Sequence, residues 1–277
     1  MRKILAQLMP VWFALLTTGA ASAAGLRPAD DPSLAQAIAS GTRTQEFRAR
    51  DIYRHPLQTL EFFGIRPDQT VVEISPGQGW YTEILAPYLH DHGRYYAAGP
   101  AADLPNASEE TKKDVATFRH KLDADPARYG NVIVTEFRPP LRADICPPGS
   151  ADLVLTFRNV HNWIDGGYEQ DAFNAFYRAL KPGGVLGVVE HRAKPYTTLE
   201  QTRKSGYVNE DYVKALAANA GFRFVAASPV NYNRRDTKDY PEGVWTLPPT
   251  FALGDKDKAK YLAIGESDRM TLKFVKP

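Results

Sequence analysis

The chain has 277 residues, with 34 basic and 32 acidic side chains and a single cysteine, Cys146. Two of the basic residues, Arg2 and Lys3, precede an apolar stretch, and without them the numbers of basic and acidic residues are equal. This balance argues against nucleic acid or an anionic membrane surface as the partner, and one cysteine excludes an internal disulfide.

The first 23 residues have the pattern of a secretory signal peptide. A positive start is followed by an apolar run over residues 4–20, and Ala21-Ser22-Ala23 places small residues at the expected cleavage site. The run is just shorter than the about 18–20 residues that cross a membrane, so an uncleaved anchor is the alternative. Pro10 within the run favours cleavage. We therefore expect an exported, periplasmic protein without stable membrane insertion after signal cleavage.

The exported part begins with residues 24–43, which are rich in alanine, proline and aspartate and predict a loose leader. A single domain then follows over residues 44–277. In its first segment, residues 44–63, apolar side chains recur at helical spacing. Pro56 is expected to divide this segment into two short helices.

Strands and helices alternate through the rest of the domain. Helical patterns lie at residues 84–89, 106–122, 173–180 and 210–220, between short apolar runs that predict strands at residues 70–75, 94–98, 132–137, 152–157, 185–190, 222–226 and 270–275. The alternation predicts an α/β fold with a doubly wound, mostly parallel sheet. Residues 231–268 show little periodicity, and so long a connection is a candidate lid insertion.

The first strand ends in a glycine turn, Pro76-Gly77-Gln78-Gly79. In a doubly wound sheet the ligand crevice lies at the carboxyl ends of the strands, where the strand order reverses. Glycines there let a ligand approach the backbone. The nicotinamide pattern G-x-G-x-x-G fails, because Thr82 stands at the third glycine position. Residues 73–79 fit acid-x-G-x-G-x-G better, with Ser75 in the place of the first glycine. A tight turn without a ligand is the alternative.

Three other segments, FRNVHNW, LKPGGVLGVVEH and ESDRMTLKFVKP, accompany the glycine turn. With them the chain resembles the class I S-adenosylmethionine (SAM)-dependent methyltransferases, and most closely an uncharacterised, often exported group of predicted methyltransferases. The resemblance covers residues 71–89, 151–192, 205–224 and 243–277. It implies a Rossmann-like sheet of seven strands with the last strand antiparallel. It also implies that SAM is bound by Glu73, Ser75, Gly77, Gln78, Gly79, Tyr81 and Thr82.

One departure from this family concerns the ribose. Most such enzymes end the second strand with an acid that holds the ribose hydroxyls, whereas this chain has Ala98-Gly99-Pro100. Asp103 is the nearest carboxylate, and only a rearranged loop would bring it to the ligand.

Polar side chains follow the fourth strand, in Arg158-Asn159-Val160-His161-Asn162-Trp163. Large polar groups at that position are costly unless they meet a ligand or one another. A methyl acceptor that is a hydroxyl or an acidic carbon needs a base. We expect His161 to be this base, Arg158 to hold an anionic group, Asn159 and Asn162 to bond polar atoms, and Trp163 to wall the pocket. The alternative is that Trp163 packs in the core and the backbone satisfies His161.

The fifth strand ends in Glu190-His191, a second candidate base site. A capping role for Glu190 and an exposed His191 are the alternative. Tyr53, with its neighbours Arg54 and His55, is expected to close the entrance of the substrate pocket, although aromatic packing also explains such a cluster. The spacing of the histidines matches no zinc signature, so no metal is expected. The chain also has no G-x-S-x-G elbow of a serine hydrolase.

Together these features predict a SAM-dependent methyltransferase that acts on a small-molecule substrate. Because SAM is made in the cytoplasm, an exported enzyme would need a supply outside it. The alternative is therefore an exported methyltransferase-fold protein whose remodelled site binds another ligand without methyl transfer. The balanced charge disfavours a third hypothesis, nucleic-acid modification.

Overall fold

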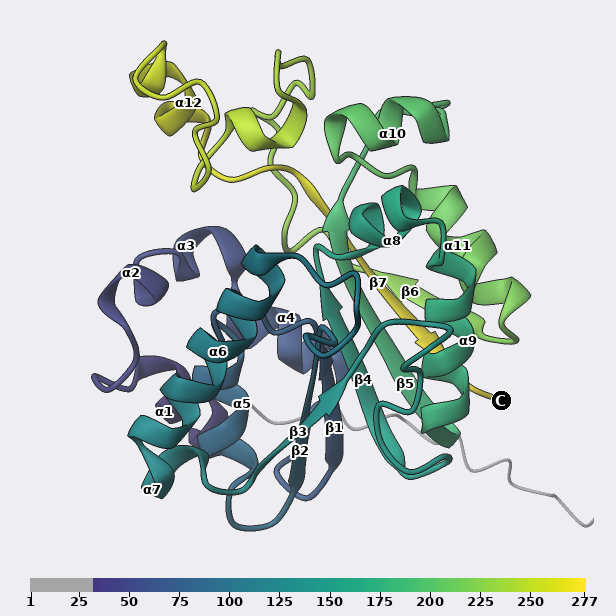
Figure 1. The fold of residues 1–277 in the computed structure, drawn as a ribbon. Helices are drawn as coiled ribbons and strands as arrows, with labels where there is room; N and C mark the ends of the chain where they lie inside the picture. Colours follow the sequence, from purple (N-terminus) through teal and green to yellow (C-terminus); the bar gives the residue numbers. More distant parts are fainter. Residues whose placement is uncertain (1–31) are drawn as a thin grey trace, which may run out of the picture.

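The computed structural model describes residues 32–277, so the predicted signal peptide and the start of the predicted leader lie outside the described residues. A sheet of seven strands in the order β3-β2-β1-β4-β5-β7-β6 runs through the molecule (Figure 1). Its strands are β1 (Thr70–Ile74), β2 (Arg94–Gly99), β3 (Val132–Glu136), β4 (Ala151–Phe157), β5 (Leu180–His191), β6 (Arg223–Ala227) and β7 (Arg269–Val275).

The direction of the strands confirms the predicted fold class. Neighbouring strands from β3 to β5 pair in parallel, whereas β7 is antiparallel to both β5 and β6. The order reverses between β1 and β4, which leave the first strand's glycine turn and the end of β4 side by side. This reversal point is where a doubly wound sheet binds its ligand.

Helices cover both faces of the sheet (Figure 1). Buried apolar side chains on one face belong to α1 (Pro32–Ala39), α4 (Pro56–Phe63), α5 (Thr82–Leu89), α6 (Glu109–Ala124) and α7 (Pro126–Tyr129). Those on the other face belong to α8 (Val160–Gly166), α9 (Glu169–Ala179) and α11 (Glu210–Asn219). Figure 1 places α10 (Leu199–Ser205) beyond the carboxyl ends of the parallel strands.

The β4 strand shows why its sequence is almost continuously apolar. Successive side chains of a strand point to opposite faces. Val154 packs against the helices of one face, and Leu153, Leu155 and Phe157 pack against those of the other. Both faces of this central strand are therefore buried, as expected for a parallel sheet.

The N-terminal part of the described chain differs from the prediction in two ways. Residues 32–39, expected in the loose leader, form α1, because Leu34 is fully buried against the α4 and α5 side of the sheet. Residues 44–63 form three helices where two were expected: α2 (Gln45–Arg48), α3 (Asp51–Arg54) and α4. Pro56 begins α4, as a proline at the first helical position can, and a turn at residues 49–50 separates the first two helices.

The long connection between β6 and β7 extends beyond the carboxyl ends of the parallel strands (Figure 1). It contains a short 3-10 helix, η1 (Gly243–Thr246), and α12 (Lys258–Ile264). This position suits the candidate lid, and its movement as a lid stays a prediction. Among residues 32–277, no helix has both the length and the apolar character that a membrane span needs.

Candidate active site

A first cavity, here called the switch-point cavity, lies where the strand order reverses and has a volume of ≈ 190 Å³. Its walls come from the loop after β1, the end of β2, α6, the end of β3 and the turn after β4: Ser75, Pro76, Gly77, Gly99, Pro100, Asp114, Val115, Phe118, Arg119, Val134, Thr135, Glu136 and Asn159. Four strand ends thus contribute to one cavity, as the fold predicts for a ligand site.

The loop after β1 owes its shape to backbone conformations that favour glycine. Ser75, Gly77 and Gly79 have φ of 50°, 58° and 85°. A Cβ added to Gly77 would meet nothing within 4 Å, so this backbone borders open space. A Cβ on Gly79 would lie 3.2 Å from the Phe118 ring. Gly77 therefore leaves room for a ligand, whereas Gly79 allows α6 to pack closely against the loop.

Three of the predicted cofactor-binding residues lie under the loop and do not line the switch-point cavity. The carboxylate of Glu73 accepts hydrogen bonds from the hydroxyls of Tyr95 and Thr82, the latter at 3.2 Å. Burial raises the pKa of Glu73 to about 7, although these two hydrogen bonds lower it. Tyr81 stacks on Phe157 with ring centroids 3.6 Å apart. Glu73, Tyr81 and Thr82 thus support the loop from within the core.

The remaining predicted cofactor-binding residues are divided. Ser75 and Gly77 line the switch-point cavity. Gln78 is exposed, and its backbone carbonyl accepts a hydrogen bond of 3.1 Å from Lys121. The contact of Gly79 is with Phe118, as described above.

The carboxylates of the switch-point cavity are not the one considered from the sequence. Asp103 is exposed, pairs with Arg142 at 3.2 Å and does not line the switch-point cavity. Asp114 on α6 and Glu136 at the end of β3 line the switch-point cavity instead. Asp114 lies one helical turn before the buried Phe118 and therefore shares its face. That spacing is the one signal in the sequence that points to Asp114.

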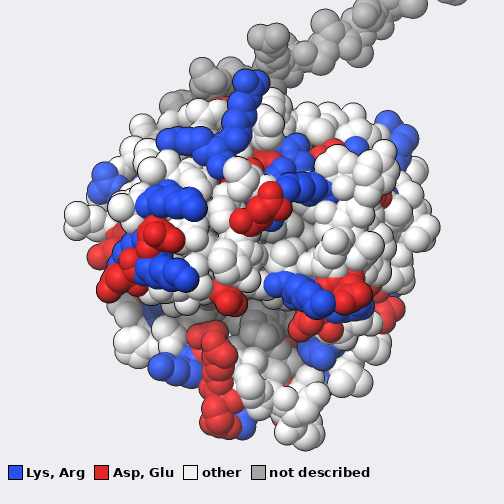
Figure 2. Space-filling view, turned by 90° about the horizontal axis from the view of Figure 1, so that it is seen from above, with Lys and Arg blue, Asp and Glu red and all other residues white. Residues whose placement is uncertain are grey.

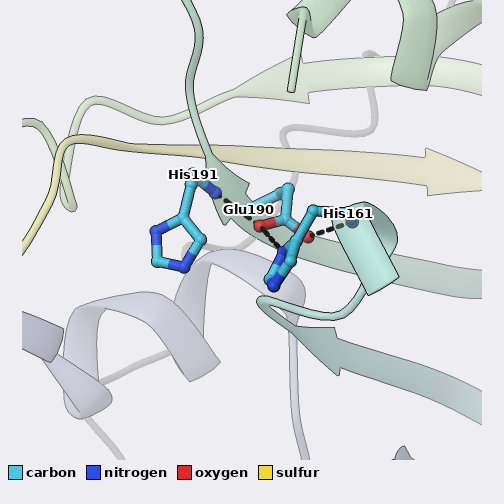
Figure 3. Close-up of side chains that lie close together, drawn as sticks. All are labelled: His161, Glu190 and His191. Atoms are coloured by element: carbon cyan, nitrogen blue, oxygen red, sulfur yellow. Dashed lines mark hydrogen bonds and ion pairs between the residues drawn. The ribbon is translucent and has the colours of Figure 1, made fainter. Parts of the chain in front are cut away.

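His161 on α8 and Glu190 on β5 form a buried hydrogen-bonded pair (Figure 3). Glu190 is fully buried, and its Oε1 lies 3.1 Å from Nδ1 of His161 and accepts the backbone N–H of His191 at 2.7 Å. Its Oε2 accepts the backbone N–H of Val160 at 2.6 Å, at the start of α8. A carboxylate is well placed there, because the first N–H groups of a helix have no partner within the helix.

This pair determines how the His161 ring can act. A carboxylate only accepts hydrogen bonds, so Nδ1 of His161 carries the proton. Nε2, on the far side of the ring from Glu190, is then a proton acceptor (Figure 3). The ring lines a second cavity, described next. A histidine oriented by a buried carboxylate is the usual arrangement of a general base.

The second cavity, here called the arginine cavity, has a volume of ≈ 240 Å³. It is lined by three arginines, one carboxylate, two histidines and the segment before β7: Arg50, Arg54, Arg158, His161, His191, Val244, Trp245, Pro248, Pro249, Thr250, Glu266 and Ser267. Seven of these twelve residues lie in residues 244–267. The candidate lid segment therefore builds one whole side of this cavity.

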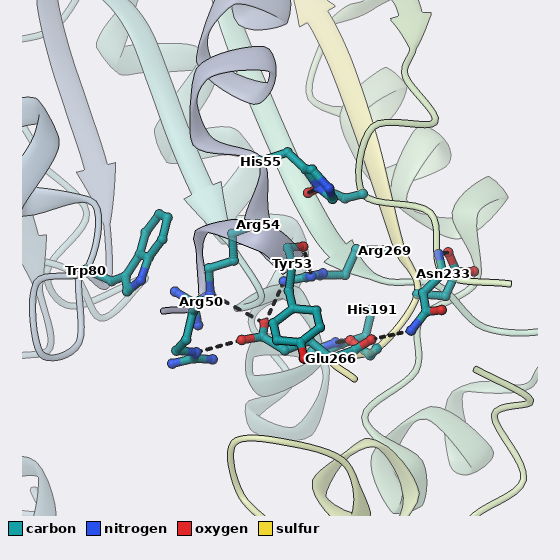
Figure 4. A network of polar contacts seen from close by, with 12 residues as sticks. Arg50, Tyr53, Arg54, His55, Trp80, His191, Asn233, Glu266 and Arg269 are labelled. Carbon is teal, nitrogen blue, oxygen red and sulfur yellow. Dashed lines mark hydrogen bonds and ion pairs between the residues drawn. The ribbon is translucent and has the colours of Figure 1, made fainter. Parts of the chain in front are cut away.

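Glu266 is the centre of an arginine cluster (Figure 4). Its Oε1 lies 2.6 Å from Nε of Arg50, and its Oε2 lies 3.0 Å from Nη1 of Arg269 and 3.4 Å from Nε of Arg54. Burial alone would raise the pKa of Glu266, but the surrounding arginines, Arg269 first, lower it to about 2. Glu266 is therefore ionised at neutral pH and is shared by three cations.

Arg158 stands apart from this cluster. No hydrogen bond or ion pair joins its guanidinium to a group of residues 32–277, and its nitrogens are not among the fully buried atoms without a partner, so solvent reaches them. Burial, and then the like charges of Arg269 and Arg50, lower the pKa of Arg158 to about 10 although Glu266 opposes them. Arg54 has its pKa lowered by burial and by Arg158. The arginine cavity thus holds more positive charge than its one carboxylate neutralises.

The two other predicted catalytic residues are also partly buried in this region. Asn159 lines the switch-point cavity, and its Nδ2 donates to the carbonyl of Ile74 at 3.0 Å, which joins the ends of β4 and β1. His191 is not exposed, and its Nδ1 lies 2.6 Å from Oγ of Ser267. Burial, followed by His161 and Arg158, lowers the pKa of His191 well below its usual value. His191 is therefore neutral at pH 7.

Three residues predicted for the substrate pocket line neither cavity. Trp163 is buried in the core against Phe137 and Phe176, which is the structural alternative considered from the sequence. It faces the sheet because it lies three positions after the buried Val160 on α8. Asn162, on the opposite side of α8, is exposed. Tyr53 packs on Gly265, where an added Cβ would lie 2.6 Å from its ring.

Glu190, the fourth residue predicted for the substrate pocket, lines neither cavity and acts through His161. The ligand atoms of His161, Glu190 and His191 lie within 4.8 Å of one another, as in a metal site. However, both oxygens of Glu190 accept backbone N–H groups, and Nδ1 of His161 is a donor. Three arginines also line the cavity and would repel a cation. The residues fit a hydrogen-bonded pair better than a metal centre.

The site residues that sequence reasoning missed are Arg50, Trp245, Glu266 and Asp114. Arg50 and Glu266 are 216 positions apart and meet in one ion pair. No periodicity or short motif reports such a contact. Arg50 follows a four-residue helix, and Glu266 lies in the segment whose sequence shows no regular pattern.

Comparisons with known proteins bear on the fold. A scan against protein-family models and a sequence search of curated proteins found no match. A SAM dependent methyltransferase from Aquifex aeolicus is similar in structure, with 16% identity, 89% of this chain and 99% of that chain covered, and a TM-score of 0.54. The cyclase SpnF has 15% identity, coverage of 86% and 84%, and a TM-score of 0.54.

A third similar structure is the phosphoethanolamine N-methyltransferase 2 of Haemonchus contortus in complex with SAM. It is 17% identical over 81% of this chain and 53% of that chain, with a TM-score of 0.52. Identities this low show the fold alone. The structural neighbours thus include class I SAM-dependent methyltransferases, and the chain has their Rossmann-like fold.

Proposed function

We propose that the protein is a SAM-dependent methyltransferase that acts on a small molecule. The observation that carries this proposal is the position of the two cavities at the end of β4. Asn159 lines the switch-point cavity, and its neighbours Arg158 and His161 line the arginine cavity. A cofactor in the first and an acceptor in the second would meet there, and the fold of the neighbouring structures supports this arrangement.

The switch-point cavity suits the adenosyl part of SAM. Gly77 borders open space, so a ligand can lie against the loop backbone. Asp114 and Glu136 are carboxylates that can accept hydrogen bonds from ribose hydroxyls, in place of the missing acid at the end of β2. Val115 and Phe118 give an apolar wall for a base. The volume of ≈ 190 Å³ is below the about 300 Å³ of common ligand pockets, so the rest of the cofactor would extend towards β4.

The arginine cavity suits the acceptor. When bound, SAM supplies a methyl group on a positively charged sulfur, which keeps the bonding electron pair as the methyl group leaves. Nε2 of His161 takes the proton from the acceptor, and Glu190 stabilises the charged ring that results. The acceptor is held against Trp245 and excluded from water by residues 244–250.

The charge on the surface supports a small-molecule acceptor over a nucleic acid. Figure 2 looks down on the face that carries α10 and α12, and side chains of both signs are interspersed over it. A nucleic-acid site would be expected to present a broad basic patch. The signal-peptide pattern of residues 1–23 supports our proposal that this enzyme works outside the cytoplasm.

Calorimetric titration of the full chain with S-adenosylhomocysteine tests the proposal. We expect micromolar binding, weakened about tenfold in Asp114→Asn by the loss of charge-assisted hydrogen bonds to the ribose. The matched control is Asp103→Asn, because Asp103 is exposed and lines neither cavity. The absence of binding by the folded wild-type chain would contradict the proposal and favour a methyltransferase fold remodelled for another ligand. The similarity to a cyclase makes this test necessary.

A further inference from the structure

The arginine cavity also carries information about the acceptor. We propose that the acceptor is a small hydroxy acid whose carboxylate or phosphate group binds Arg158 while its hydroxyl faces His161. This inference rests on the proposed function, because it assigns the acceptor of that reaction.

The first argument is the charge inside the cavity. Arg50, Arg54 and Arg269 share the single carboxylate of Glu266. Arg158 lines the same cavity and is paired with no group of residues 32–277. Because no protein group pairs with this guanidinium, it is free to form charge-assisted hydrogen bonds with an anion that enters the cavity. An anionic ligand is therefore the chemistry that this cavity lacks.

The second argument is that the backbone of Arg158 has a fixed and uncommon conformation. Its φ is 62°, a conformation that is uncommon for a residue with a side chain. Its backbone N–H donates to the carbonyl of Val189 at 2.7 Å, which ties the strained turn to β5. Strained backbone of this kind concentrates at ligand sites, where it aims a side chain. Here the aimed side chain is the unpaired guanidinium.

The third argument is that the cavity can hold an acidic group and a hydroxyl group of one ligand at the same time. A guanidinium offers a planar fork that matches the two oxygens of a carboxylate or phosphate. His161 lines the same cavity and has Nε2 as a proton acceptor. Val244 and Trp245 add apolar lining to the same cavity. A compact molecule with an acidic group, a hydroxyl and an apolar body uses all three features of the ≈ 240 Å³ cavity.

The experiment compares charged and uncharged probes of one shape by calorimetric titration of the full chain. The probes are 4-hydroxybenzoate, 4-hydroxybenzamide and inorganic phosphate. We expect at least one anion to bind, and the benzamide to bind about tenfold more weakly than the benzoate, because it lacks the charge-assisted hydrogen bonds. Arg158→Met should weaken the anions about tenfold, and Arg158→Lys should weaken them less. Arg223→Met is the control, because Arg223 is exposed on β6.

A second variant, Arg50→Gln, keeps the inference testable if Arg158→Met does not fold. Arg50→Gln removes another cation that lines the same cavity and should weaken the anions in the same direction. The inference is overturned if neither anion binds the wild-type chain more tightly than it binds folded Arg158→Met.

A further pair of titrations separates this inference from the proposed function. If Arg158→Met weakens S-adenosylhomocysteine but not 5′-methylthioadenosine, which lacks the amino-acid end, Arg158 holds the cofactor's carboxylate. That result overturns the acceptor assignment and leaves the methyltransferase proposal intact. If the anions bind as expected but S-adenosylhomocysteine does not, the anion site stands and the proposed function fails.

Discussion

Oε1 of Glu190 lies 3.1 Å from Nδ1 of His161, and Oε2 of the same carboxylate accepts the backbone N–H of Val160 at 2.6 Å. One fully buried side chain of β5 therefore holds both the ring of the candidate base and the first turn of the helix that carries it. The orientation of His161 and the position of α8 depend on the same group. This dual role has consequences for both stability and activity.

Glu190→Gln should destabilise the fold and reduce turnover. The amide NH₂ of glutamine faces N–H donors that the carboxylate accepts, so at least one buried donor loses its partner. We expect a loss of about 1–3 kcal/mol in the free energy of unfolding, measured by urea denaturation. The exposed Glu200, which pairs with Lys204 on α10, gives the control Glu200→Gln. If both variants unfold at the same urea concentration, the buried hydrogen bonds of Glu190 do not contribute to stability.

Glu73 should make the protein less stable as the pH rises through its titration range. Its pKa is about 7 in the folded chain and about 4.5 when exposed, so the folded state binds the proton more tightly. Stability due to this group is present at low pH and is lost between about pH 4.5 and 7, by about 3 kcal/mol in all. Urea denaturation across this range should show the decrease in wild type and its absence in Glu73→Gln. A wild-type decrease that persists in the variant would contradict the assignment.

Glu266 should behave in the opposite way. Its pKa is about 2 in the folded chain, so its contribution to stability is present above about pH 4.5 and is lost as the pH falls towards 2. Glu266→Gln should therefore cost about 3 kcal/mol at pH 7 and progressively less in acid. The exposed Glu46 on α2 provides the control Glu46→Gln. A cost that does not change with pH would mean that the arginine pairs contribute little.

The two glycines of the loop after β1 should respond differently to alanine. Both have positive φ, so each substitution adds about 1–2 kcal/mol of backbone strain. In Gly79→Ala the new Cβ also meets the Phe118 ring at 3.2 Å, so this variant should be the less stable by urea denaturation. In Gly77→Ala the Cβ points into open space beside the switch-point cavity. Relative to its loss of stability, Gly77→Ala should therefore lose more affinity for S-adenosylhomocysteine than Gly79→Ala does. If Gly79→Ala loses more affinity on this basis, the ligand lies elsewhere.

Trp163 offers a test of packing against binding. It is buried among Phe137, Phe173 and Phe176 and lines neither cavity. Trp163→Leu should reduce the free energy of unfolding by about 2–4 kcal/mol through the volume it removes from the core. The affinity of the folded variant for S-adenosylhomocysteine and for 4-hydroxybenzoate should equal that of wild type. If the folded variant binds only one of the two ligands more weakly than wild type does, Trp163 belongs to the substrate pocket.

The secondary structure was largely predictable because its signals are local. The apolar run of β4 reports burial on both faces, and the glycines at 77 and 79 mark the turn after β1. The helix α1 was missed because two large apolar residues, Leu34 and Ile38, among alanines do not show within the sequence which surface they cover. Leu34 becomes a core residue only when α4 and α5 lie against it.

Part of the site was predictable for the same reason. Ser75 and Gly77 on one strand end and Arg158, Asn159 and His161 on the next were expected in the crevice, and each lines one of the two cavities. Glu73, Tyr81 and Thr82 were expected to touch a ligand but lie beneath the loop. Strand alternation shows that a residue faces one side of the sheet, but not whether a ligand or a helix lies there.

By itself the sequence determined the succession of the strands, the helices α5, α6, α9 and α11 between them, and the strand ends from which polar groups project. Only the tertiary structure decided which of those groups meet. Arg50 and Glu266 are 216 positions apart and form an ion pair. Arg158 lines the same cavity without an ion-pair partner. Periodicity reports burial over a few residues, whereas the electrostatics of a cavity depend on contacts between distant segments.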